Sequence, residues 1–198
     1  MSAALYKRYF DHLRQKVELS QEDEELIKKH LYHQHLNKKE FLLHEGQPCT
    51  EVAFVATGFL RVYSVDTDQV DHIVQFAPEN WLASDLFSFI TGENAIYNID
   101  AIEKSELILM SKASHEELLN ISVAYEKFIR IQITNAYVAL QRRVNSNLSL
   151  SIQERYESFL KLHGDIALRA PQHMIASYLG LAPETLSRVR KKMSENEQ

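Results

Sequence analysis

The stretch from 172 to 191 constrains the fold more than any other part of the chain. Apolar residues recur at helical spacing on both sides of Gly180, and a glycine can take the positive φ of a sharp helix end. Pro183 suits the first turn of a new helix, because its missing N–H would be unpaired there anyway. Ala176 is small enough for two helices to cross closely. These signals predict a helix-turn-helix, whose second helix enters the major groove of DNA.

Composition narrows the class of protein. The 198 residues are 45% hydrophobic, enough for a proper core, and carry a formal net charge of −5. That charge disfavours bulk coating of nucleic acid but allows a local basic face on a specific reader. The single cysteine, Cys49, cannot supply a disulfide, an iron–sulfur cluster or a structural zinc site, and is either packed or a redox switch. The charged start of the chain and the lack of a long apolar run predict a cytoplasmic protein with no membrane partner.

Short apolar segments separated by turn residues fill the region from about 36 to 110. Many short strands at this spacing predict an antiparallel sandwich or barrel. One helix is predicted before it over 5–17, and another starts at the N-cap Ser20 and continues through Leu31. The chain as a whole is predicted to be α+β, with residues 1–113 as the β domain and its flanking helices. The predicted strands are 40–43, 52–56, 59–65, 72–76, 99–102 and 107–110.

The spacing of apolar residues over 114–148 predicts one long helix with two apolar faces. One face contains Tyr125 and Phe128 and is expected to cover the β domain. The other contains Ile133 and Leu140. Because a helix of this length outruns a β domain of this size, we expect the second face to pair with the same helix of a second subunit. Burial of both faces within a monomer is the alternative.

The order of β domain, long helix and helix-turn-helix resembles the Crp/Fnr family of bacterial transcription regulators. The similar segments are 41–47 and 54–63 in the β domain and 184–188 in the second helix of the helix-turn-helix, the reading helix. Segments 73–81 and 135–143 look like a branch common in Bacteroidetes. The resemblance implies a cyclic-nucleotide-binding-like β-roll (a double-stranded β-helix), a dimerisation helix over 114–148 and a helix-turn-helix domain over 149–198.

The resemblance also implies a homodimer that binds a palindromic operator in double-stranded DNA, with RNA polymerase as a further partner. The chain ends soon after the reading helix, so we expect the β-hairpin wing that often follows to be absent.

The family's reading helix offers a Glu and an Arg one turn apart, which here are Glu184 and Arg188. An Arg can bond guanine with both arms, and a Glu can accept from cytosine. The alternative is a surface ion pair between the two. Predicted base contacts are Pro183, Glu184, Ser187 and Arg188, and predicted DNA-backbone contacts are Arg169, Gln172, His173, Thr185, Arg190, Lys191 and Lys192.

Cyclic AMP sensors of the family hold the cyclic phosphate with an Arg–Ser pair. Here neither Arg nor Lys occurs from 62 to 103, whereas Asp85 and Glu93 do. A buried phosphate without a cation is costly, so we expect that cyclic AMP is not the ligand, although helix-end N–H groups can also hold an anion. A pocket for an unknown small molecule is predicted at Trp81, Ser84, Asp85, Asn94 and Asn98, and a ligand-free roll is the alternative.

An enzyme is the competing interpretation. His33, His35 and Glu40 imitate the first metal motif of cupins, but the glycine expected before the His pair is missing and a second motif is not apparent. A haem would need an axial ligand, for which nothing distinguishes one of His44, His72 and His115. We therefore expect no catalytic residue, no metal and no cofactor.

Overall fold

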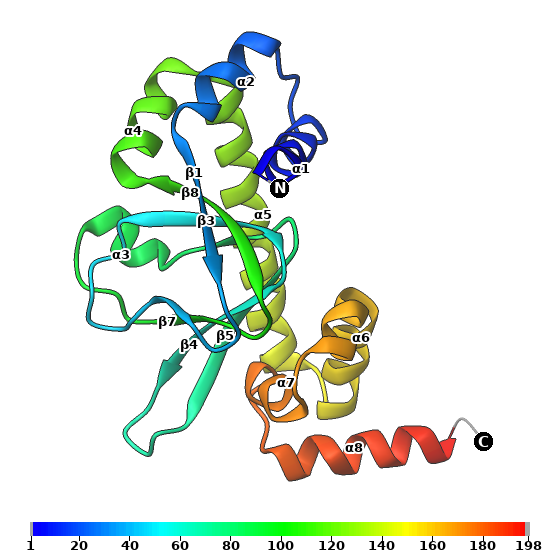
Figure 1. Ribbon diagram of the computed structural model, residues 1–198. Coiled ribbons are helices and arrows are strands. Elements are labelled where there is room, and N and C mark those ends of the chain that lie inside the picture. The colour runs from blue at the N-terminus through cyan, green and yellow to red at the C-terminus, as the bar shows by residue number, and fades with distance from the viewer. Residues whose placement is uncertain (1, 197–198) are drawn as a thin grey trace.

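A computed structural model describes residues 2–196. A β-roll flanked by helices is joined by a long helix to a helical C-terminal region (Figure 1). The helices are α1 (Ser2–Arg14), α2 (Gln21–Lys28), α3 (Leu86–Thr91), α4 (Lys112–Ile121), α5 (Val123–Ser149), α6 (Ile152–Arg169), α7 (Gln172–Tyr178) and α8 (Pro183–Asn196). The strands are β1 (Leu31–Leu36), β2 (Phe41–Leu43), β3 (Glu51–Thr57), β4 (Phe59–Val65), β5 (Asp71–Pro78), β6 (Leu82–Ala83), β7 (Asn98–Ala101) and β8 (Ser105–Ser111).

The strands form two four-stranded antiparallel sheets, with the orders β1-β8-β3-β6 and β2-β7-β4-β5. Both sheets contribute buried side chains to one core, which includes Leu36, Val55 and Leu107 from the first sheet and Leu60 and Ile99 from the second. All six strands predicted from the sequence are present. The predicted α+β fold with an antiparallel β-roll is confirmed.

The start of the β-roll differs from the prediction. The helix that begins at Ser20 ends at Lys28, and Leu31 begins strand β1 instead of continuing the helix. Leu31 pairs with Met110 of β8, and this pairing buries its side chain. Tertiary pairing has therefore overridden a local helical period. His33, which a helical reading places on a solvated helix end, lies in this strand.

The predicted single helix over 114–148 is two helices. Ser122 interrupts it with an extended backbone (φ −124°, ψ 106°), and its hydroxyl accepts a hydrogen bond from the Tyr125 N–H at 3.2 Å. This N-cap starts α5 afresh, so that Leu118 of α4 and Tyr125 of α5 are buried in one core. None of the helices within residues 2–196 combines the length and apolar character needed to cross a membrane.

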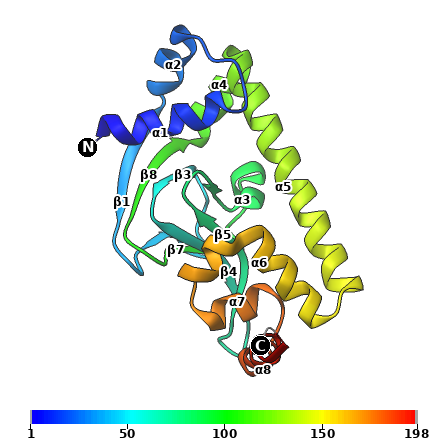
Figure 2. The same ribbon diagram turned by 90° about the vertical axis from the view of Figure 1, so that its right-hand side faces the viewer.

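A further core crosses from the β-roll into the C-terminal helices. Phe59 of β4 and Phe76 of β5 are clustered with Phe159 of α6, Ile175 of α7 and Leu186 of α8. Figures 1 and 2 both show α7 beside the β4–β5 hairpin. The helix-turn-helix is therefore packed directly on the β-roll.

Candidate DNA-binding surface

The turn between α7 and α8 has the geometry that the sequence predicted. Gly180 takes a φ of +68°, its N–H donates to Ser177 O at 3.0 Å, and the Leu181 N–H donates to Ala176 O at 2.9 Å. These two bonds form a Schellman motif, which satisfies the last carbonyls of α7 and ends the helix sharply. Pro183 then begins α8. The two short helices and the tight turn are confirmed.

The reading helix α8 has one buried and one exposed side. Leu186 is only 1% exposed and packs with Ile175 and Ala176 of α7. Figure 1 shows α8 along the lower end of the molecule. The outward positions include every predicted base-contacting residue and three of the predicted phosphate-binding cations: Pro183, Glu184, Ser187, Arg188, Arg190, Lys191 and Lys192 are all exposed.

Arg188 and Glu184 are not paired through their side chains. The Arg188 Nε donates to the backbone carbonyl of Glu184 at 3.4 Å, a weak contact that leaves the rest of the guanidinium exposed. Gln172 and His173 lie at the start of α7 and are both exposed, and Thr185 is half-buried in the first turn of α8. These side chains occupy positions that a DNA duplex could reach, and their DNA contacts stay a prediction.

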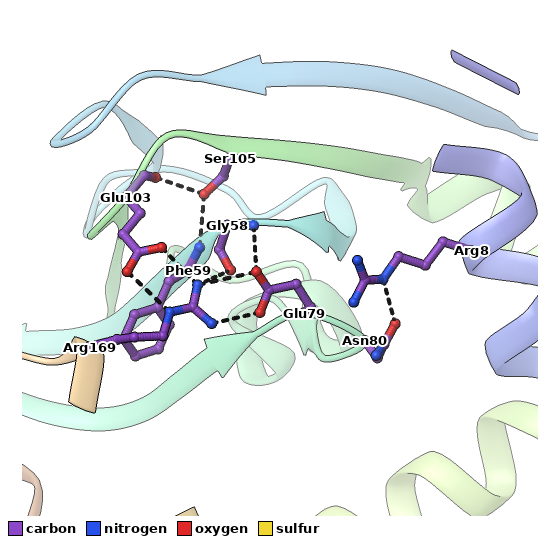
Figure 3. Close-up of polar contacts among 8 residues, drawn as sticks. All are labelled: Arg8, Gly58, Phe59, Glu79, Asn80, Glu103, Ser105 and Arg169. Carbon is purple, nitrogen blue, oxygen red and sulfur yellow. Dashed lines mark hydrogen bonds and ion pairs between the residues drawn. The ribbon is translucent and has the colours of Figure 1, made fainter. Parts of the chain in front are cut away.

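Arg169 is an exception, because its side chain bonds within the chain. Its Nε and Nη2 donate to the Glu103 carboxylate at 3.1 and 2.7 Å, and its Nη1 donates to Glu79 at 2.7 Å (Figure 3). Nη2 also donates to the Gly58 carbonyl at 3.1 Å. Two carboxylates already take that cation in this structure, which disfavours the predicted contact between Arg169 and a DNA phosphate. Glu79 and Glu103 carry no local sequence signal of this pairing, so the sequence does not predict it.

Asp85, predicted to line an effector pocket, is fully buried and has a structural role. Its carboxyl group caps α3 by accepting from the Ser88 N–H at 3.0 Å. It also accepts from the Ile96 and Tyr97 N–H groups at 2.8 and 3.1 Å, which closes the loop after α3. Three backbone donors that could face an anion are therefore occupied by the chain's own side chain.

The other predicted pocket residues have separate surroundings. Trp81 is 40% exposed and its ring meets His163 of α6, with 6.2 Å between centroids. Asn98 accepts from the Glu45 N–H at 3.0 Å, whereas Asn94 is exposed and Ser84 half-buried. A hollow of about 200 Å³ in the β-roll contains none of these five residues in its lining, which consists of Leu42, Leu43, Gln47, Pro48, Cys49, Thr50, Glu51 and Ile99.

Cys49 borders that hollow as a packed residue. Its side chain is buried, and its thiol donates to the Glu51 carbonyl at 3.3 Å. Burial raises the pKa of the thiol, which disfavours the thiolate needed for redox reactions. Of the two interpretations of this cysteine, packing is the one that the geometry supports.

The cupin-like residues do not converge. His33 and His35 both bond to Glu106 of β8, whereas the Glu40 carboxylate accepts from the Asn37 N–H at 2.8 Å. Within residues 2–196, His, Cys, Asp and Glu side chains do not form a group of three placed to hold a metal ion. The three candidate haem ligands have unrelated partners: His44 stacks on Phe41, His72 bonds to Asp66, and His115 bonds to the Tyr125 hydroxyl.

Parts of the sequence are similar to known proteins. The family described as "Cyclic nucleotide-binding domain" matches residues 33–122. The nitrogen fixation regulation protein FixK of Rhizobium meliloti (strain 1021) is 28% identical over 148 residues. That alignment covers 71% of this chain and 65% of FixK, so the chain spans slightly less than two thirds of that relative.

Solved structures resemble the whole arrangement. FixK2 from Bradyrhizobium japonicum has a TM-score of 0.74 at 21% identity, covering 84% of this chain and 86% of FixK2. The c-di-GMP responsive global regulator CLP from Xanthomonas campestris has a TM-score of 0.69 at 15% identity, covering 87% and 91%. A Crp/Fnr-family transcriptional regulator from Thermus thermophilus has a TM-score of 0.67 at 16% identity, covering 83% and 87%. Residues 33–122 are thus similar to cyclic nucleotide-binding domains, and the chain has the fold of solved Crp/Fnr transcription regulators, a family that its sequence motifs also resemble.

Proposed function

We propose that this protein is a transcription regulator that binds a palindromic DNA operator as a homodimer. The observation that carries the proposal is the exposed face of α8, which presents Glu184 and Arg188 one turn apart on a well-formed helix-turn-helix. The relatives support it, because FixK is named a regulation protein and CLP a global regulator. A regulator of this kind is not an enzyme.

The chemistry of α8 suits a DNA groove. The guanidinium of Arg188 can donate two hydrogen bonds to guanine, and the Glu184 carboxylate can accept from the cytosine amino group. Arg190, Lys191 and Lys192 follow on the same helix and would neutralise phosphates on either side of the contacted bases. The overall negative charge of the chain then limits binding to DNA that α8 can fit.

The homodimer is supported by an uncovered apolar stripe on α5. Ile133, Tyr137, Leu140 and Val144, which we call the dimer seam, are 48%, 59%, 56% and 50% exposed. Their spacing of four, three and four residues is that of a coiled-coil seam. Figure 2 shows α5 along one side of the molecule, with the β-roll and α6 on its inner side. A twofold axis through this seam would pair the seam of one subunit with the same residues of the other. It would also place the two reading helices on one face of the DNA.

Cyclic AMP is not the effector in this proposal. The segment from 62 to 103 contains neither Arg nor Lys to pair with a cyclic phosphate. Asp85 holds the Ile96 and Tyr97 N–H groups, and its carboxylate would repel a phosphate placed there. Isothermal titration calorimetry with cyclic AMP is expected to give no binding heat, and micromolar affinity would contradict this part of the proposal.

In-vitro selection of DNA sites by the purified protein tests the function. We expect enrichment of a palindrome whose half-site centres are about 34 Å apart, the rise of one helical turn. Affinity for the selected site is expected to fall steeply with added salt, because several cations contact phosphates. A selection that yields no preferred sequence would contradict sequence-specific DNA binding.

A further inference from the structure

Arg169, the last residue of α6, reaches from the C-terminal helices into the β-roll. Its guanidinium meets the Glu103 carboxylate through two hydrogen bonds of 3.1 and 2.7 Å and the Glu79 carboxylate through two of 2.7 and 3.2 Å (Figure 3). Arginine is suited to this place, since its planar fork can serve two carboxylates at once, which a lysine cannot do. We call Arg169, Glu79 and Glu103 the interdomain clamp.

The two carboxylates of the clamp depend on Arg169. The side chains of Glu79 and Glu103 are only 25% and 39% exposed, and both point at the same cation. Burial alone would raise the pKa of Glu79, but the hydrogen bonds from Arg169 and from backbone N–H groups hold it below its usual value. Without the guanidinium, two partly buried negative charges would face each other.

Arg169 contacts the β-roll at the turn between β3 and β4. Its guanidinium lies 5.0 Å from the Phe59 ring centroid and also bonds to the carbonyl of Gly58. Glu79 accepts a hydrogen bond from the Gly58 N–H at 3.0 Å, and the next residue, Asn80, accepts one from Arg8 of α1 at 3.0 Å. The clamp is therefore attached to a backbone turn that further hydrogen bonds hold in place.

A second attachment joins the helix-turn-helix to the edge of the sheet. Strand β5 is an edge strand, and α7 and α5 bond to backbone groups along its free edge. The Ser177 hydroxyl donates to Asp71 O at 2.6 Å and accepts from the Ile73 N–H at 2.9 Å. Arg143 of α5 donates to Ile73 O, Val74 O and Tyr178 O at 3.1, 2.6 and 2.9 Å. At this point the dimerisation helix, the β-roll and α7 meet.

Both attachments contact the shared apolar core that contains Phe59, Phe76, Ile175 and Leu186, because Arg169 lies over the Phe59 ring and Arg143 over the Tyr178 ring. One attachment alone would leave the helix-turn-helix free to rotate about it. Two separate attachments together with a packed core fix both its position and its rotation relative to α5. In a dimer joined through α5, that orientation determines how far apart the two reading helices lie.

We infer that Arg169 is a positioning residue, which sets the half-site spacing that the dimer accepts by clamping the helix-turn-helix to the β-roll. The inference rests on the proposed function. It differs from a phosphate contact by Arg169, which would add affinity for every DNA whatever its spacing.

The test measures binding of wild type and Arg169→Met to a set of duplexes. The set contains the selected palindrome, the same half-sites moved one base pair closer or farther apart, and a single half-site. We expect Arg169→Met to bind the selected palindrome roughly tenfold more weakly and to discriminate less between spacings, with nearly unchanged binding to the single half-site. Arg169→Lys is expected to restore part of the discrimination, because it keeps the charge but not the double fork.

Arg14→Met is the matched control. Arg14 also bonds to two acids, Asp11 and Glu24, but at the N-terminal helices. It is expected to leave the spacing preference unchanged. Glu103→Gln, which removes one charge of the clamp, is expected to loosen the spacing preference without unpairing Arg169 completely. It serves as the second variant if Arg169→Met does not fold by circular dichroism.

The outcomes separate the two claims. Wild-type DNA binding with no change of spacing preference in Arg169→Met and Glu103→Gln would overturn the clamp alone. An equal loss on palindrome and half-site, with a weaker salt dependence, would instead identify Arg169 as a phosphate contact and also overturn it. Failure of the wild type to bind any duplex would overturn the proposed function, and the clamp's role with it.

Discussion

At the scale of single residues, Gly58 holds the turn on which the interdomain clamp is built. Its φ is +99°, and a Cβ there would lie 2.3 Å from Ser105 Oγ and 2.6 Å from Lys104 O. Gly58→Ala is expected to lower the free energy of unfolding by about 2 to 4 kcal/mol, because backbone strain and a steric clash act together. Urea denaturation measures the change. Gly46→Ala is the matched control: its φ is +83° with nothing within 4 Å, so only the strain is expected. Equal losses in both variants would contradict the steric argument.

Residue roles were predictable where they depend on local chemistry. Gly180 and Pro183 indicate a helix end and a helix start through backbone geometry alone, and the structure has both. Arg169, which precedes the helix-turn-helix in the sequence, is predicted as a cation that contacts the DNA backbone. Its actual partners, Glu79 and Glu103, lie 90 and 66 residues away along the chain. Pairings at such separation are set by the packed fold, which a periodicity does not describe.

At the scale of elements, α5 carries the proposed dimer. Leu140→Asp would place a charge in the middle of the dimer seam of each subunit, so we expect the dimer dissociation constant to rise by about a hundredfold or more. Sedimentation equilibrium measures it. Val70→Asp is the control, because Val70 is 51% exposed in the β4–β5 turn and is not part of the dimer seam. An unchanged dimer in Leu140→Asp would show that the subunits associate through another surface.

Two boundaries of helices and strands are not predicted by the sequence patterns. Helical spacing continues unbroken through Ser122, yet the chain divides there into α4 and α5, since the serine hydroxyl caps a new helix. Strand β1 is not predicted because Leu31 fits the preceding helical period, and its pairing with Met110 is decided by a strand about eighty residues later. The two-residue strand β6 was not predicted either, whereas the six predicted strands are clearly separated by turn residues.

At the scale of the whole molecule, three half-buried histidines connect stability to pH. Burial lowers the pKa of His12, His115 and His163 below the usual 6.5, because it disfavours the imidazolium. As the pH falls below 6.5, these histidines bind protons in the unfolded chain before they do so in the folded chain. The free energy of unfolding therefore decreases between pH 6.5 and the lower folded-state pKa values. We expect a lower urea midpoint at about pH 5.5 than at about pH 7.5.

A single variant isolates this effect. The Nε2 of His12 is buried without a hydrogen-bond partner in the described part of the chain, and its ring contacts those of Phe54 and Phe128. His12→Leu is therefore expected to lose less stability on acidification than the wild type. His173→Gln, a change at an exposed position, is the comparison variant. A urea midpoint that does not change between the two pH values would contradict the argument.

The central claim is that α8 reads DNA bases, and site selection with Arg188→Ala beside the wild type tests it most directly. We expect the variant to lose its preference at one base pair in each half-site, with roughly 1 to 3 kcal/mol less discrimination at each of them. Arg190→Ala is the matched control on the same helix, expected to weaken binding to all sequences alike and to reduce its salt dependence. If Arg188→Ala selected the same sites with unchanged preference at every position, α8 would not be the element that reads the operator.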